Sequence, residues 1–156
     1  MIFMYAIIRI RGTVQLRKEN NDTMRMLNLT KGNHLSLANE TQQNEGMIKK
    51  VQDYVTWGTI SLNTLEYLLE KRGRLVGNKR VTVEYLKKFK IGSFKELAEQ
   101  VNKDKKVLAS YGIKPVFRLN PPSKGYERAG IKKNYKVGGA LGFRGEAINE
   151  LIMRMA

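Results

Sequence analysis

The chain has 156 residues, 42% of them hydrophobic, and a formal net charge of +15. It contains no cysteine, which excludes disulfides and thiolate metal sites, and its apolar runs are too short for a transmembrane helix or a signal peptide. So large a positive charge indicates a polyanionic partner, most simply nucleic acid. We therefore expect a soluble, intracellular protein with one sizeable core.

Three strands are predicted in the first 60 residues, over 5–12, 34–39 and 53–60. The first, YAIIRIRG, alternates along its length, so one face should meet the core. The other face carries Arg9 and Arg11, and we expect it to face solvent or an anion.

Two helices are predicted between these strands. The first covers 21–30, with Asp22 or Thr23 as its N-cap, and the second begins at Thr41 and carries an apolar stripe at helical spacing. The order β-α-β-α-β is about the minimum for a sheet with two helices on one face.

Residues 61–112 read as helical. Helices are expected over 61–73, begun by Ser61 or Asn63, over 81–89, begun by Thr82, and over 93–101, begun by Ser93, with one more helical turn over 106–112. An extended stretch at 115–119 could add a strand to the first sheet, because Pro115 cannot continue a helix.

The segment 118–139 combines four glycines, two adjacent prolines and six Lys or Arg residues against one Glu. Its apolar residues are too sparse to offset the ordering entropy of roughly 1–2 kcal/mol per residue. Phosphate contacts can offset that entropy from outside. We expect this segment to fold against RNA, to be mobile without it, and to lead into an amphipathic helix over 143–155.

No catalytic, cofactor or metal site is predicted. His34 is the single histidine, and the acidic residues form no evident pair for acid–base catalysis. The run GGALGFRG (138–145) lacks the residue order of a phosphate-binding loop and is interpreted as a flexible turn.

The candidates for RNA contact are basic or imidazole side chains at strand ends, in a lysine pair, or in the glycine-rich segment. They are Arg9, Arg11, Lys31, His34, Lys49, Lys50, Arg118, Lys124, Arg128, Lys132, Lys133, Lys136 and Arg144. Six other lysines read equally well as solvated helix faces: Lys87, Lys88, Lys95, Lys103, Lys105 and Lys106.

Several stretches together are similar to one family. YAIIRIRG, MLNLTKGNHLSL, NEGMIKKVQDYVTWG, RLNPPSKG and VGGALGFRGEAINELIMRM resemble the ribosomal protein L-thirty family in its long archaeal form, whose eukaryotic counterpart is called L-seven. The resemblance covers essentially the whole chain, and the short bacterial form resembles residues 4–60 alone. Family members usually begin at Met4, so the leading MIF is interpreted as an alternative start.

The resemblance implies an α+β fold whose β-α-β-α-β core (1–60) is related to ferredoxin-like sandwiches. A helical extension (61–112) and a part with an added strand, the basic segment and a C-terminal helix (113–156) would follow. It also implies a non-catalytic constituent of the large ribosomal subunit in the cytoplasm. Such a protein would bind the large 23S-type rRNA near the 5S rRNA, beside other ribosomal proteins, and would not be a homo-oligomer.

Two other functions are considered. The helices at 61–73, 82–89 and 93–101 could form the helix-turn-helix of a DNA-binding regulator, although the apolar face of the third looks buried. An RNA-modifying enzyme would need a cofactor loop or an acid–base cluster, and neither is visible. The loop 71–82 has no pattern that assigns its contacts.

Overall fold

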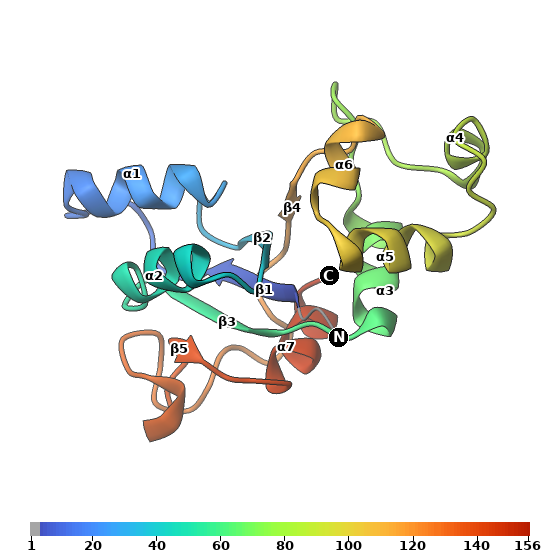
Figure 1. Ribbon diagram of the computed structural model, residues 1–156. Helices are drawn as coiled ribbons and strands as arrows, with labels where there is room; N and C mark the ends of the chain where they lie inside the picture. Colours follow the sequence, from blue (N-terminus) through green and yellow to red (C-terminus); the bar gives the residue numbers. More distant parts are fainter. Residues whose placement is uncertain (1–3) are drawn as a thin grey trace.

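One five-stranded sheet organises the chain. The computed structural model describes residues 4–156, so the expected alternative start at residues 1–3 lies outside the described residues. Its strands are β1 (Met4–Arg9), β2 (His34–Asn39), β3 (Val55–Thr59), β4 (Val116–Arg118) and β5 (Gly142–Phe143). They lie in the order β4-β2-β1-β3-β5 (Figure 1). All neighbours pair antiparallel except β3 and β5, which are parallel.

Helices α1 (Lys18–Met26) and α2 (Gln42–Lys50) cover one face of the sheet, as predicted (Figure 1). The hydroxyl of Thr41 caps α2 by accepting from the N–H of Asn44 at 3.3 Å. α1 begins earlier than predicted, and Thr23 lies inside it, donating to the carbonyl of Glu19 at 3.0 Å. A hydroxyl bonded to its own helix in this way gives no cap. Arg17, the residue before the observed start, forms no side-chain cap either, so no capping residue marks where α1 begins.

The second face of the sheet is also covered. Alternate β1 and β2 residues pack in one hydrophobic cluster with α3 (Leu62–Arg72), α5 (Phe94–Lys103) and α7 (Ala147–Met155). All six residues of β1 are buried, Arg9 included. The expectation that one face of this strand meets solvent or an anion is therefore wrong, because segments distant in sequence cover both faces.

The helical extension follows the predicted capping pattern. The hydroxyls of Ser61, Thr82 and Ser93 cap α3, α4 (Val83–Lys87) and α5, and α6 (Lys106–Ser110) is the predicted extra turn. The apolar face of α5 is buried, so it cannot serve as an exposed DNA-reading surface. None of the helices between residues 4 and 156 is long and apolar enough to cross a membrane.

The C-terminal part returns to the sheet at both edges. β4 pairs with β2, which confirms the added strand expected at 115–119. Gly142 and Phe143 pair with β3 as β5, so the stretch 138–145 is more than a flexible turn. As a result α7 begins at Ala147, later than the predicted residue 143.

Candidate nucleic-acid interface

Arg9, a predicted RNA contact, is fully buried at the end of β1. Its Nη1 donates to the carbonyl of Leu29 at 2.7 Å, and its Nε donates to the carbonyl of Arg11 at 3.0 Å. Burial lowers the pKa of its guanidinium. Arg9 joins loops of its own chain, and its position leaves it little surface for RNA.

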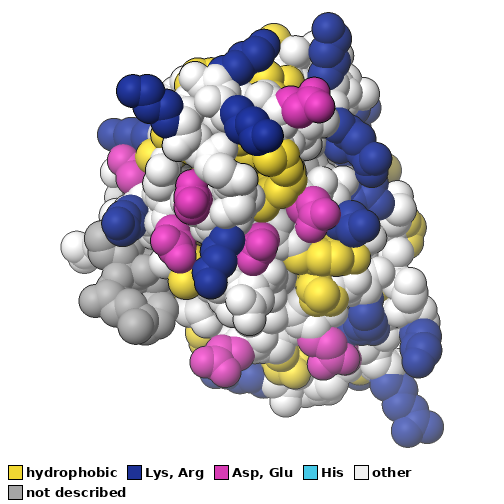
Figure 2. Space-filling model, turned by 90° about the vertical axis from the view of Figure 1, so that its right-hand side faces the viewer, with side chains coloured by type: hydrophobic (Ala, Val, Ile, Leu, Met, Phe, Trp, Pro, Cys, Tyr) yellow, Lys and Arg dark blue, Asp and Glu magenta, His cyan; other side chains and the backbone are white. Residues whose placement is uncertain are grey.

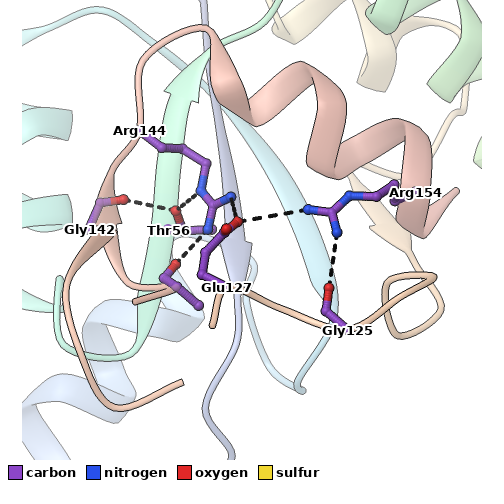
Figure 3. Close-up of polar contacts among 7 residues, drawn as sticks. Thr56, Gly125, Glu127, Gly142, Arg144 and Arg154 are labelled. Atoms are coloured by element: carbon purple, nitrogen blue, oxygen red, sulfur yellow. Dashed lines mark hydrogen bonds and ion pairs between the residues drawn. The ribbon is translucent and has the colours of Figure 1, made fainter. Parts of the chain in front are cut away.

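Arg144 is the second predicted contact that lies inside the protein, only 5% exposed (Figure 3). Its Nε donates to Thr56 Oγ1 on β3 at 2.8 Å, and its Nη2 donates to the carbonyl of Ala140 at 2.8 Å. Its Nη1 forms an ion pair with Glu127 at 3.1 Å. Burial is the largest influence on its pKa and lowers it, although Glu127 opposes that shift. Arg144 thus clamps the basic segment to the sheet.

Glu127 is the single acidic residue of the segment 118–139, and its carboxylate pairs with arginines of the same chain. Besides Arg144, Arg154 of α7 approaches its carboxylate at 3.8 Å (Figure 3). Arg154 also donates to the carbonyl of Gly125 at 3.0 Å. The next residue toward the N-terminus, Tyr126, donates from its hydroxyl to Asn33 Oδ1 at 2.8 Å. These contacts fix the start of the segment and leave no free acid in it.

The remainder of the segment is ordered by its own backbone. The N–H of Ala129 donates to the carbonyl of Gly138, and the N–H of Gly139 donates to the carbonyl of Asn134 at 2.8 Å. A Cβ at Gly139 would overlap the carbonyl of Lys133, so only glycine allows this close approach. The structure therefore differs from the expectation that the segment lacks contacts to order itself. Hydrogen bonds of its own backbone order it, although its apolar side chains are sparse.

Five predicted contacts of the segment lie exposed on this ordered loop. Within residues 4–156 none of them takes part in an ion pair. They are Lys124, Arg128, Lys132, Lys133 and Lys136. With Glu127 neutralised, they form a surface of one sign, which suits a polyanion.

Three predicted contacts meet at the other edge of the sheet. His34 opens β2 directly opposite Arg118 of β4, and Lys31 lies exposed in the preceding turn. Burial lowers the pKa of His34, and the charges of Arg118, Lys31 and Arg9 lower it further. Its buried Nδ1 has no hydrogen-bond partner among the described residues.

The remaining predicted contacts do not join either group. Lys49 and Lys50 are exposed in the last turn of α2, and Lys49 borders a pocket of about 270 Å³ beside Tyr5 and Trp57. Arg11 lies over the ring of Tyr54, 5.2 Å from its centroid. The structure thus divides the predicted residues into the two groups described above, three scattered residues (Lys49, Lys50 and Arg11) and two buried arginines (Arg9 and Arg144).

Sequence reasoning missed three arginines of the loop 71–82. Arg72 and Arg74 line a pocket of about 160 Å³ with Arg118, and Arg80 lies opposite Arg74. Their density in the sequence was visible, but no periodicity placed them. Lys105, for which the sequence favours a solvated helix face and an RNA contact equally, is half-buried and donates to the carbonyl of Leu37 at 3.2 Å.

Figure 2 shows the side of the molecule on which Figure 1 places α4 and α5. Asp and Glu side chains lie there among Lys and Arg. Such a mixed surface suits a polyanion less well than the segment 118–139. No group of three or more His, Asp or Glu side chains within residues 4–156 could hold a metal ion.

Known proteins are similar over nearly the whole chain. The model of the family described as ribosomal protein L30p/L7e matches residues 5–55. The large ribosomal subunit protein uL30 of Nanoarchaeum equitans is 51% identical, covering 97% of this chain and 97% of the relative. The proteins of the same name from Methanococcus maripaludis and Methanosphaera stadtmanae are 49% and 48% identical, again over 97% of this chain and over 98% and 99% of the relatives. With about half of its residues shared over nearly its whole length, the chain belongs to the ribosomal protein L30p/L7e family.

Proposed function

We propose that this protein is a structural constituent of the large ribosomal subunit in the cytoplasm, where it binds and stabilises the large rRNA near the 5S rRNA. Membership of the family and the names of the archaeal relatives support its place in the subunit. The observation that carries RNA binding is the exposed, unpaired basic surface of the segment 118–139. The proposed role is assembly and stabilisation, without catalysis.

Phosphate contacts are the mechanism we propose for this surface. Lys132 and Lys133 lie on an irregular loop and Lys136 lies in the 3₁₀ helix η1 (Tyr135–Val137) that follows, so the three can follow an RNA backbone better than residues fixed along one long helix. Lysine side chains that neutralise phosphates release counterions, which makes binding steeply dependent on salt and largely independent of sequence. Such contacts position the protein on the RNA without reading its bases.

The contacts of Arg144 and Glu127 support binding by ordering the loop in advance. A loop that is already folded loses less conformational entropy when it binds. The buried clamp therefore contributes to RNA affinity without touching RNA. In this proposal Arg144 orders the loop, and the lysines of the loop contact the phosphates.

Replacing Lys132, Lys133 and Lys136 together by Ala tests the proposal. The slope of log K against log salt for large-subunit rRNA should flatten by roughly 2–3 units, at about 0.7–0.9 per lost contact. The fold should survive, because all three side chains are exposed. A matched control replaces Lys87, Lys95 and Lys103, which are exposed on the helical extension, and should change the slope by less than about 1 unit. An unchanged slope with a lost thermal transition in the test variant would contradict the proposal.

Position near the 5S rRNA needs a separate experiment. Because the chain has no cysteine, Lys133→Cys provides a single attachment point for an iron–EDTA probe. We expect hydroxyl-radical cleavage in reconstituted subunits to fall in the large rRNA beside the 5S rRNA and in the 5S rRNA itself. Cleavage confined to distant parts of the large rRNA would reject the location and leave the subunit assignment standing.

A further inference from the structure

Four arginines gather at the edge of the sheet that carries β4. Arg72 ends α3, Arg74 and Arg80 lie on the loop that follows, and Arg118 belongs to β4. Arg72, Arg74, Asn78 and Arg118 line a pocket of about 160 Å³. These residues come from parts of the chain up to 46 positions apart, so the fold alone brings them together.

Arg74 and Arg80 form an antiparallel bridge, directly opposite one another. Like charges in that arrangement are destabilising. The backbone holds them there: the N–H of Leu75 donates to the carbonyl of Lys79 at 2.7 Å, and the N–H of Lys114 donates to the carbonyl of Arg74 at 2.8 Å. The loop therefore keeps two arginines side by side against their mutual repulsion.

Within residues 4–156 no acidic side chain forms an ion pair with these arginines. The pocket lining contains neither Asp nor Glu, and both ion pairs found within residues 4–156 involve other arginines. Glu70 shares a neighbouring pocket with Arg80 but forms no ion pair with it in the described part of the chain. Burial lowers the pKa of Arg74, and Arg80, Arg72 and Arg118 lower it further. The positive charge of this cluster is therefore not balanced by the described residues, which favours the binding of an anion.

We propose that this pocket binds a backbone phosphate of the large rRNA, as a contact separate from those of the segment 118–139. The proposal rests on the proposed function and names a second site for the same RNA. Guanidinium groups suit phosphate because their planar forks donate two parallel hydrogen bonds. The amide of Asn78 adds a neutral donor. His34, opposite Arg118, and the exposed Lys31 extend the basic surface from the pocket along the sheet edge.

The test variant replaces Arg74, Arg80 and Arg118 by Gln in the full chain. The probe is deproteinised large-subunit rRNA of Methanococcus maripaludis, titrated over a range of salt concentrations. We expect the slope of log K against log salt to flatten by roughly 0.7–1.8 units, at about 0.7–0.9 for each of the one or two phosphates contacted. A matched variant with Lys87, Lys95 and Lys103 replaced by Gln removes the same charge and should flatten it by less than about 0.5 unit.

Equal slopes for wild type and test variant, or equal flattening by both variants, would overturn the pocket proposal. Failure of the wild-type protein to bind this rRNA would instead reject the proposed function. The melting temperature of each free variant checks its fold, and the test variant should be at least as stable as wild type because it loses repulsion. Should it unfold, Arg118→Gln alone replaces it, since Arg118 lines the pocket, is exposed, and its side chain forms no hydrogen bond within residues 4–156. That variant should flatten the slope by up to about 0.9 unit, and no change would overturn the proposal.

Phosphate ethylation interference provides an independent measurement. Ethylation of one or two discrete phosphates should weaken binding of the wild-type protein. Ethylation of the same phosphates should not change binding of the test variant. Inorganic phosphate is the competing ligand to examine. Protection of the pocket arginines from phenylglyoxal by millimolar inorganic phosphate, with no such discrete rRNA phosphates, would mean that the pocket takes a free anion and would overturn the proposal.

Discussion

In residues 4–60 the side chains that fix the structure are mostly apolar and lie on both faces of β1, β2 and β3. In residues 118–146 a small apolar cluster of Ala140, Leu141 and Tyr126 is supplemented by polar side chains, above all Arg144 and Glu127. Residues 4–60 carry 8 basic and 5 acidic residues over 57 positions, whereas residues 118–146 carry 7 basic and 2 acidic residues over 29 positions. Each region is ordered, but by different interactions.

The difference shows how a segment can be folded and still keep its charges available. Apolar burial turns side chains inward over a whole sheet face, whereas a few buried hydrogen bonds can order a loop and leave the lysines of that loop outside. Hydrogen bonds that involve a charged group contribute about 1.5–3 kcal/mol each. Few contacts are therefore enough, and the loss of one should be felt mainly in the segment.

The largest effect is expected where the two regions touch. A Cβ at Gly58 of β3 would overlap the carbonyl oxygen of Gly145, which cannot rotate away. Gly58→Val should destabilise the protein by about 3 kcal/mol in urea unfolding, despite the preference of Val for strands. As a control, Gly46→Ala in α2 meets open space and should stabilise by about 0.5–1 kcal/mol. If Gly58→Val proved neutral, the close contact between the regions would be refuted.

A smaller and more local effect is expected from the clamp. Arg144→Met removes hydrogen bonds to Thr56, Glu127 and Ala140. It should cost about 2–3 kcal/mol, less than the sum of three separate bonds, because contacts of one network do not add and Met keeps the buried aliphatic stem. Amide hydrogen exchange should rise through residues 126–140 and stay slow in β1 to β3. Arg154→Met is the matched control: it removes a longer, part-exposed ion pair with Glu127 and an exposed hydrogen bond to the carbonyl of Gly125, and should cost about 1 kcal/mol. Uniformly faster exchange in both regions would show that Arg144 holds the whole fold.

The smallest effect is a pH dependence at His34. Its pKa in the folded protein lies below the usual 6.5, through burial and then the charges of Arg118, Lys31 and Arg9. As the pH falls, His34 therefore takes up its proton at a higher pH in the unfolded chain than in the folded protein. The free energy of unfolding should be constant above about pH 7 and fall as pH drops through 6.5. Melting temperatures between pH 7.5 and 5.5 measure this. His34→Gln should remove that part of the slope, and identical slopes in the two proteins would rule out the assignment.

The sequence by itself determined the β-α-β-α-β order, the caps of α2 to α5, the added strand β4 and the family. Alternation, helical spacing and capping act over a few residues, so they can be recognised without the fold. Thr41 and Ser93 cap as predicted because each bonds a backbone N–H three residues away. The family motifs, such as NEGMIKKVQDYVTWG, are likewise contiguous.

Only the tertiary structure decided which charges are available. Alternation placed Arg9 opposite the core-facing residues of its strand, but α1 and α2 make that side a core as well. Arg144 lies in a glycine-rich run typical of exposed loops, yet its side chain is buried against β3, where it donates a hydrogen bond to Thr56. The arginine pocket joins the end of α3 to β4 across 46 positions. Whether a side chain is buried depends on what packs over it, and segments far apart in the chain supply that cover.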